Sequence, residues 1–182
     1  MPLPEETQKI IYKYCEKHLP KFNWYENYLS FIKDKKLKHR IINEFKSLRF
    51  FHKLYEGIQA KDENKIFEIR YQIIGYASIY EIILNYFLSY YYSKNTIKSK
   101  KFHEKCDLAK TDILYKLKNG KGEYIDIFED IKEIYRYRNG VHIAAEQNKN
   151  IKYELELSRK AYRRIKPFFE QIENKLKKDN KI

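Results

Sequence analysis

The sequence contains few of the residues that interrupt regular structure. Its 182 residues include 5 glycines and 4 prolines. Folds built only from strands need a turn about every 8–12 residues, and those turns consume both residue types. The shortage therefore argues against a β-sandwich or barrel and favours long helices.

Cysteine is equally scarce, because only Cys15 and Cys106 occur. Two distant cysteines provide neither a disulfide framework nor a thiolate metal site. The N-terminus also lacks the basic and apolar segments of a secretion signal, and no Gly-rich phosphate loop is found. We therefore expect a cytoplasmic protein that uses no metal and no cofactor.

The stretch Ile73–Tyr92 is the one that needs testing as a membrane span. It carries a single charge, Glu81, near its middle. A carboxylate at the centre of a bilayer costs about 2.5–3.5 kcal/mol. We therefore predict a buried core helix here and no contact with a membrane.

Positive charge is abundant. Lys and Arg number 38 against 25 Asp and Glu, which gives a net charge of +13, and aromatic residues make up 16% of the chain. Such a charge attracts polyanions, so nucleic acid or an acidic protein is a plausible partner, although the codon usage of an AT-rich gene can account for part of it. The basic runs Lys33–Arg40 and Lys98–Lys101 could follow a phosphate backbone or simply be solvated faces.

Apolar residues recur with a helical period along most of the chain, which predicts an all-α, up-and-down helical bundle. The expected helical segments are Glu5–Leu19, Leu37–Gly57, Asp62–Tyr92, Phe102–Gly120, Tyr124 into Arg136–His142, and Lys152–Leu176, with a basic, aromatic segment at Phe22–Lys36. We expect one domain spanning residues 1–182, in which residues 1–60 form additional N-terminal helices.

Three local expectations accompany this prediction. Asp62 is placed to cap the helix that follows it. Ser93–Ser99 is expected to be a polar loop, and residues 177–182 are expected to form a frayed tail.

The cluster Arg136, Arg138, Asn139 and His142 is the strongest candidate for chemistry. An imidazole exchanges a proton near neutral pH, and a guanidinium holds a phosphate with two hydrogen bonds and stabilises extra negative charge on it. These are the needs of metal-free RNA cleavage, in which the ribose 2′-hydroxyl attacks the neighbouring phosphate. Because Arg49 and His52 form a similar pair elsewhere, spacing alone does not establish catalysis.

The geometry of the cluster depends on Asn139 and Gly140, which can end or kink the helix. On a straight helix Arg138 and His142 are one turn apart and share a face, whereas Arg136 points about 120° away. Glu81, on the predicted buried helix, is a second candidate: it could orient Arg136 or Arg138, or pair with Arg70 or a tyrosine hydroxyl.

The order of helices, the buried segment Ala77–Leu84 with its Glu81, and the motif Arg136–His142 resemble the HEPN (higher eukaryotes and prokaryotes nucleotide-binding) family. The resemblance covers residues 63–176. The family motif is an Arg separated by four to six residues from a His, and five residues separate Arg136 from His142. This spacing favours Arg136 as the functional arginine, although Arg138-Asn139 matches the family preference for a polar residue after the Arg.

The resemblance implies a homodimer in which the motifs of two protomers form one composite cleft. Many members of the family are metal-independent ribonucleases that act as toxins or in antiviral defence, and some only bind. We therefore expect an RNA-cleaving enzyme with catalytic Arg136 and His142, supported by Arg138, Asn139 and Glu81. A cognate antitoxin or defence-system partner would fit this role, and the alternative is a non-catalytic helical module that binds nucleic acid or a partner protein.

Overall fold

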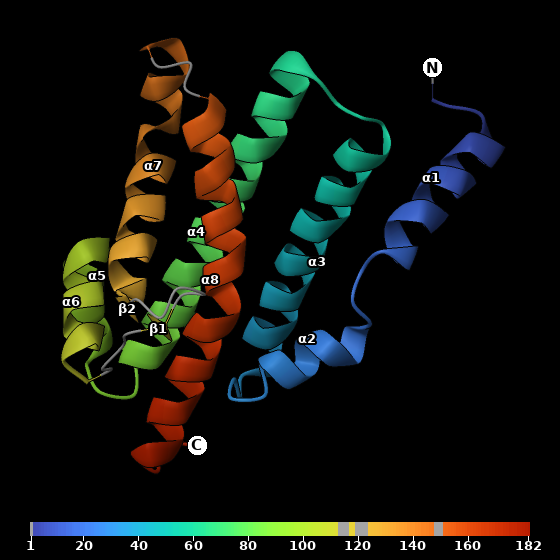
Figure 1. Cartoon of the computed structure of the whole chain (residues 1–182). Coiled ribbons are helices and arrows are strands. Elements are labelled where there is room, and N and C mark those ends of the chain that lie inside the picture. The colour runs from blue at the N-terminus through green and yellow to red at the C-terminus, as the bar shows by residue number, and fades with distance from the viewer. Residues whose placement is uncertain (1, 113–116, 119–123, 148–150) are drawn as a thin grey trace.

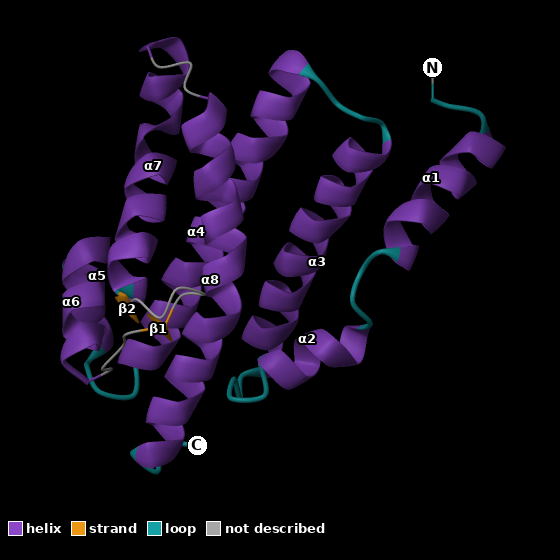
Figure 2. Ribbon diagram, in the orientation of Figure 1, coloured by secondary structure: helices purple, strands orange, loops and turns teal. Residues whose placement is uncertain are grey.

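A computed structural model of the chain describes residues 2–112, 117–118, 124–147 and 151–182 (Figures 1 and 2). The fold is all-α, as the sequence predicts, with one two-residue strand pair. In chain order the elements are α1 (Glu5–Lys17), α2 (Phe22–Tyr28), α3 (Lys35–Gly57), α4 (Asp62–Leu88), α5 (Lys94–Ser99), α6 (Phe102–Asp112), β1 (Leu117–Lys118), β2 (Tyr124–Ile125), α7 (Ile127–Gln147) and α8 (Ile151–Lys178).

The four long helices α3, α4, α7 and α8 run alternately up and down (Figure 1). Helix α4 packs against the other three and against α6, and its buried side chains cover more than half of its circumference. Its apolar stretch is therefore the centre of the bundle, which explains why it lacks the polar face of a surface helix. No described helix is both long enough and apolar enough to cross a bilayer.

Helices α3 and α4 approach closely at Gly75. A β-carbon on Gly75 would lie 2.8 Å from Leu48 Cδ1, and Leu48 is fully buried. Only a residue without a side chain fits between the two helices at this point. This contact fixes the distance of the N-terminal helices from the rest of the bundle.

Helix α1 packs on α3 at the edge of the molecule, and Cys15 is its one buried residue (Figure 1). Helix α2 lies across the end of α3 and contacts α8. Its buried Tyr25 meets Phe45 of α3 edge to face, with ring centroids 5.4 Å apart. Aromatic contacts of this kind attach the N-terminal helices to the core.

Two predictions about helix starts are wrong. Asp62 is the first residue of α4 rather than its cap, and Lys61, in the cap position, has no side-chain capping bond. Ser93–Ser99 is not a loop, because α5 occupies Lys94–Ser99 and the Ser93 hydroxyl accepts a hydrogen bond from the Thr96 amide. Ser93 is the N-cap of α5, because its side chain satisfies a backbone amide of the first turn that has no partner within the helix. This capping signal outweighs the polarity of the segment.

The chain between α6 and α7 also differs from the prediction. Helix α6 ends at Asp112, and Leu117–Lys118 pairs with Tyr124–Ile125 in an antiparallel bridge instead of extending the helix. Helix α7 begins only at Ile127, after Asp126, whose carboxylate accepts a hydrogen bond from the Phe128 amide. The expected break at Gly120 and Gly122 lies outside the described residues.

The C-terminal tail is ordered rather than frayed. Helix α8 continues through Pro167 to Lys178, and Asp179 accepts a hydrogen bond of 2.6 Å from the Tyr91 hydroxyl. Lys175 forms a second contact to the Asp179 carboxylate. Tyr91 lies just after the end of α4, and Lys175 lies on α8. The bond from Tyr91 to Asp179 therefore holds the end of α8 against the end of α4.

Candidate functional site

Helix α7 carries the predicted arginine and histidine motif. The helix passes through Asn139 and Gly140 and ends only at Gln147, so of the two outcomes considered for Asn139-Gly140, an end of the helix does not occur. A β-carbon at Gly140 would contact nothing within 4 Å, so close packing does not require glycine there. Position 142 lies on the helix, but the His142 side chain lies outside the described part of the structure, and its catalytic role stays a prediction.

Arg138 is held by Glu81 across the interface between α7 and α4. The Arg138 Nη1 atom lies 2.7 Å from Glu81 Oε2, and the two side chains are 29% and 28% exposed. The Tyr135 hydroxyl donates a hydrogen bond of 3.2 Å to Glu81 Oε1, and the guanidinium carbon lies 5.0 Å from the centre of the Tyr135 ring. Burial and the Glu81 charge together raise the pKa of Tyr135, so the phenol stays protonated and donates this bond.

These contacts decide between the sequence-based interpretations of Glu81. Glu81 binds Arg138 and a tyrosine hydroxyl, and no contact with Arg136 or Arg70 is found among the described residues. Arg70 pairs instead with Glu154 of α8 through two nitrogen atoms, at 2.8 and 3.1 Å. Of the two motif arginines, Arg138 is therefore the one that Glu81 contacts, through one guanidinium nitrogen.

Helical geometry relates these residues to position 142. At about 100° per residue, positions 138 and 142 differ by about 40°, and positions 135 and 142 by about 20°. Position 136 differs from position 142 by about 120°. Arg138, Tyr135 and position 142 thus share one face of α7, whereas Arg136 belongs to the neighbouring face.

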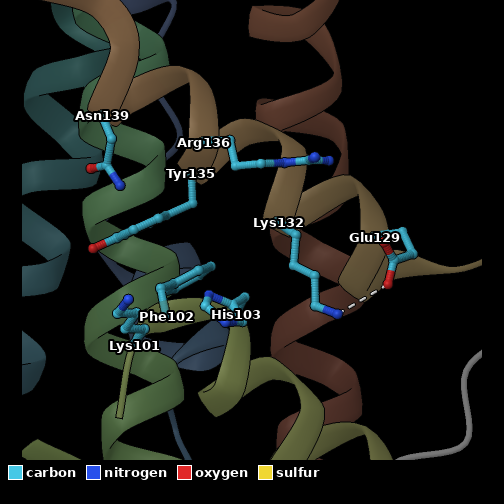
Figure 3. Close-up of a pocket in the computed structure, with 8 residues that line it drawn as sticks. All are labelled: Lys101, Phe102, His103, Glu129, Lys132, Tyr135, Arg136 and Asn139. Carbon is cyan, nitrogen blue, oxygen red and sulfur yellow. Dashed lines mark hydrogen bonds and ion pairs between the residues drawn. The ribbon is translucent and has the colours of Figure 1, made fainter. Parts of the chain in front are cut away.

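The neighbouring face of α7 borders a cavity of about 520 Å³ that opens between α7 and the first turn of α6 (Figure 3). Helix α7 contributes residues at helical spacing, and the chain at the start of α6 contributes the opposite wall. The lining residues are Lys101, Phe102, His103, Glu129, Lys132, Tyr135, Arg136 and Asn139.

Two aromatic rings form the boundary between the cavity and the Glu81 cluster. Phe102 stacks on Tyr135 with ring centroids 3.7 Å apart and planes 7° apart. Tyr135 therefore takes part in both features, because its ring lines the cavity and its hydroxyl binds Glu81. Tyr135 lies outside the Arg136–His142 motif, although its place three residues before Arg138 puts it on the same helical face.

The polar residues of the cavity differ in how far they are already paired. Lys132 bonds Asp107 at 2.6 Å and Glu129 at 3.1 Å. Burial lowers the pKa of Lys132, but these hydrogen bonds outweigh it and leave the pKa above its ordinary value. The side chains of Arg136, Lys101, His103 and Asn139 are exposed, and none forms a hydrogen bond or ion pair with another described side chain.

The remaining histidines were expected on the surface. His18, His39 and His103 are exposed, as predicted. His52 is not: its Nδ1 atom lies 3.0 Å from the Glu68 carboxylate, which is 1% exposed. The second arginine and histidine pair is thus part of the bundle interior, since Arg49 also packs over the Tyr162 ring at 4.3 Å.

Comparisons with other proteins add no assignment. No protein-family model matches the chain, and no curated protein and no solved structure shows significant similarity to it. Within the described ranges, no group of three or more His, Cys, Asp or Glu side chains is arranged to hold a metal ion. The geometry of α4, α6 and α7 is therefore the basis for a functional proposal.

Proposed function

We propose that this protein is a metal-independent endoribonuclease of the HEPN type. The observation that carries the proposal is the Glu81–Arg138 ion pair, which fixes a guanidinium one helical turn before His142 on an unbroken α7. A held arginine beside an imidazole supplies a cation and a proton-transfer group at adjacent positions. The cationic cavity on the next face of the same helix offers room for the rest of an RNA strand.

The proposed reaction is attack of a ribose 2′-hydroxyl on its own neighbouring phosphate. A general base takes the 2′-hydroxyl proton as the new oxygen–phosphorus bond forms. The bond from phosphorus to the 5′-oxygen of the next nucleotide breaks, and a general acid gives that oxygen a proton. The products are a 2′,3′-cyclic phosphate and a 5′-hydroxyl.

Each side chain has a separate role in this reaction. His142 is the proton-transfer group, and Arg138 stabilises the charge that develops on the phosphate in the transition state. Glu81 and Tyr135 position Arg138 without touching the substrate. We prefer Arg138 to Arg136 because α7 continues through Gly140, which is the condition under which Arg138 shares a face with position 142.

A homodimer completes the proposed site. The reaction needs both a base and an acid, whereas the motif of one chain contains a single histidine. Two protomers that pair their α7 motifs would bring two copies of His142 to one cleft. The family resemblance supports this arrangement, and the same resemblance suggests a toxin or antiviral-defence effector that is restrained by an antitoxin or partner.

The alternative is a helical module that binds RNA or a partner protein without cleaving it. One observation favours it: Glu81 already occupies a nitrogen of Arg138, whereas Arg136 and Lys101 are free of such partners among the described side chains. A binding module would use the free cations and would not need His142. The two functions therefore differ in what a change at His142 does.

The test is cleavage of a labelled single-stranded RNA in buffer containing EDTA. We expect the unaltered protein to cleave it and His142→Ala to lower the rate by about 10²–10⁴-fold, the usual contribution of a general acid or base. His39→Ala is the matched control, because His39 is an exposed histidine on α3. Equal cleavage by a folded His142→Ala protein would exclude the catalytic assignment, and RNA binding with no cleavage by any form would favour the binding module.

A further inference from the structure

Two cationic side chains line the cavity between α6 and α7 without an ion pair to a described side chain. Arg136 and Asn139 extend from α7, and Lys101 and His103 from the start of α6 (Figure 3). Glu133 interacts electrostatically with Arg136, but its carboxylate already bonds Lys160 at 2.7 Å and the Tyr153 hydroxyl at 2.9 Å. The described side chains therefore leave an excess of positive charge at the cavity, which favours an anion from outside the chain.

The acidic residues near the cavity are committed to other partners. Glu129 and Asp107 bond Lys132 and so cancel its charge. Glu104 accepts a hydrogen bond of 2.7 Å from the Lys101 amide and lies 3.4 Å from Lys100 Nζ. Because Glu104 already caps the first turn of α6, the attraction for an anion comes from the Arg136 and Lys101 side chains rather than from the helix end.

The position of the cavity along α7 identifies which part of a ligand it would meet. Phe102 and His103 lie level with Tyr135, which is seven residues before position 142. Seven residues of helix span about 10 Å. The cavity lining also reaches Asn139, three residues before position 142, so only a group bound at the Phe102 end of the cavity lies about 10 Å along the helix from the reacting phosphate. At that distance the group can belong to the same strand.

We propose that this cavity is a subsite for a backbone phosphate of the RNA strand, flanking the phosphate that is cleaved. Arg136 binds it through its planar fork and Lys101 as a point charge, while His103 and Asn139 donate hydrogen bonds. The identification of the strand as RNA rests on the proposed function. We favour RNA over an acidic protein segment because the cavity lies on the same helix as the Arg138–His142 motif of the proposed ribonuclease.

The subsite is tested by RNA binding in the His142→Ala background, where the strand stays intact. We would measure the affinity of a fluorescent single-stranded RNA by anisotropy over a range of salt concentrations. For Arg136→Gln combined with Lys101→Gln, we expect an affinity about tenfold lower or more at low salt. Each neutralised phosphate contributes about 0.7 to the salt slope for single strands, so the loss of this one phosphate contact should lower the slope by about 0.7.

The matched control removes the same charges elsewhere. Lys13 and Lys17 are exposed residues on α1, which lies beyond α3 on the other side of α4 from the cavity (Figure 1). Lys13→Gln combined with Lys17→Gln should leave the affinity and the salt slope near those of the parent. If the two double variants behave alike, binding follows net charge and the subsite does not exist.

Two further readouts separate this inference from the proposed function. In an otherwise unaltered protein the subsite variant should raise KM much more than it lowers kcat, because it contacts a phosphate that does not react. Loss of cleavage in His142→Ala with unchanged RNA binding by the subsite variant would overturn the subsite and leave the ribonuclease standing. RNA binding that depends on Arg136 and Lys101 in a protein that never cleaves RNA would support the subsite and overturn the ribonuclease. Failure of every form to bind RNA would overturn both the subsite and the ribonuclease.

Discussion

Helix α4 carries two carboxylates, Glu68 and Glu81, in very different surroundings. The Glu68 side chain is 1% exposed and meets His52, Lys65 and Gln72. The Glu81 side chain is 28% exposed and meets Arg138 and Tyr135 at the edge of the cavity face. One helix thus holds one carboxylate that is itself sealed from solvent and one that remains partly exposed beside its arginine.

The difference separates a contribution to stability from a contribution to function. A carboxylate that is itself fully buried depends on its hydrogen bonds, because a change that weakens them leaves a buried polar group poorly satisfied and raises the cost of the folded state. A partly exposed pair contributes little to stability because water screens it and can replace either partner. We therefore assign Glu68 to the fold and Glu81 to the site, and each prediction below tests that division.

The largest effect should come from Arg138. Replacing Arg138 with Lys keeps the charge but removes the fork that Glu81 and a phosphate can share, so kcat for RNA cleavage should fall by about 10²–10³-fold. Arg136→Lys should act mainly on KM. Steady-state kinetics of both variants compare the two arginines directly, and a larger loss of kcat in Arg136→Lys would return the catalytic role to Arg136.

The second effect concerns stability. Burial raises the pKa of the Glu68 carboxyl, but the hydrogen bonds from His52 and Lys65 outweigh it and leave the pKa below its ordinary value. A folded-state pKa below the unfolded value adds stability at neutral pH that disappears as the pH falls through the folded-state pKa. Glu68→Gln should therefore lower the free energy of unfolding by about 1–3 kcal/mol near pH 7, and by less in acid.

Urea titrations of Glu68→Gln at several pH values measure this contribution. Glu156→Gln is the control, since Glu156 is an exposed acid on α8. The kcat of the folded Glu68→Gln fraction should match that of the parent. A loss of kcat without a loss of stability would show that Glu68 belongs to the site and would remove the distinction from Glu81.

Glu81→Gln should do the reverse of Glu68→Gln: it should lower kcat and leave the free energy of unfolding almost unchanged. The amide still accepts a hydrogen bond from Arg138 but no longer carries the charge that strengthens it. We expect kcat to fall about tenfold, equivalent to about 1.4 kcal/mol, with KM little changed and the free energy of unfolding altered by less than about 1 kcal/mol. Because Glu81 acts through Arg138, combining Glu81→Gln with Arg138→Lys should cost less than the sum of the single changes.

The smallest effect is expected at Gly140. Alanine has room there and is a better helix former than glycine, so Gly140→Ala should raise the free energy of unfolding by about 0.5–1 kcal/mol and preserve cleavage. Thermal unfolding and the EDTA cleavage assay measure the two quantities. A more stable but inactive Gly140→Ala protein would indicate that catalysis needs a bend in α7, the arrangement that brings Arg136 toward position 142.

Sequence patterns anticipated the elements whose signals are local. The apolar period of 3.6 residues located the long helices, and the scarcity of glycine and proline excluded an all-β fold. The predicted secondary structure was wrong where a feature of a few residues, such as a capping serine, competed with the pattern of a longer segment. Polarity suggested a loop before α6, whereas the Ser93 cap starts α5, and the helical pattern through Leu117 conflicts with its pairing in β1.

The site required information that sequence spacing does not contain. The pairing of Glu81 with Arg138 depends on how α4 and α7 pack, and the choice between Arg136 and Arg138 depends on whether α7 continues past Gly140. The cavity forms only when the start of α6 meets Tyr135, so Lys101 and His103 had no visible relation to the motif. The resemblance to the HEPN family remains a prediction, as does the role of His142.

The central claim is that the cluster on α7 cleaves RNA through its own 2′-hydroxyl, and the chemistry of the product ends tests it most directly. RNA fragments produced in EDTA should carry a 2′,3′-cyclic phosphate on one end and a 5′-hydroxyl on the other, and DNA of the same sequence should resist. Mass spectrometry of the fragments identifies these groups. Fragments with 5′-phosphates that appear only when Mg²⁺ is added would contradict the account, because that outcome requires an external water and a metal-assisted mechanism.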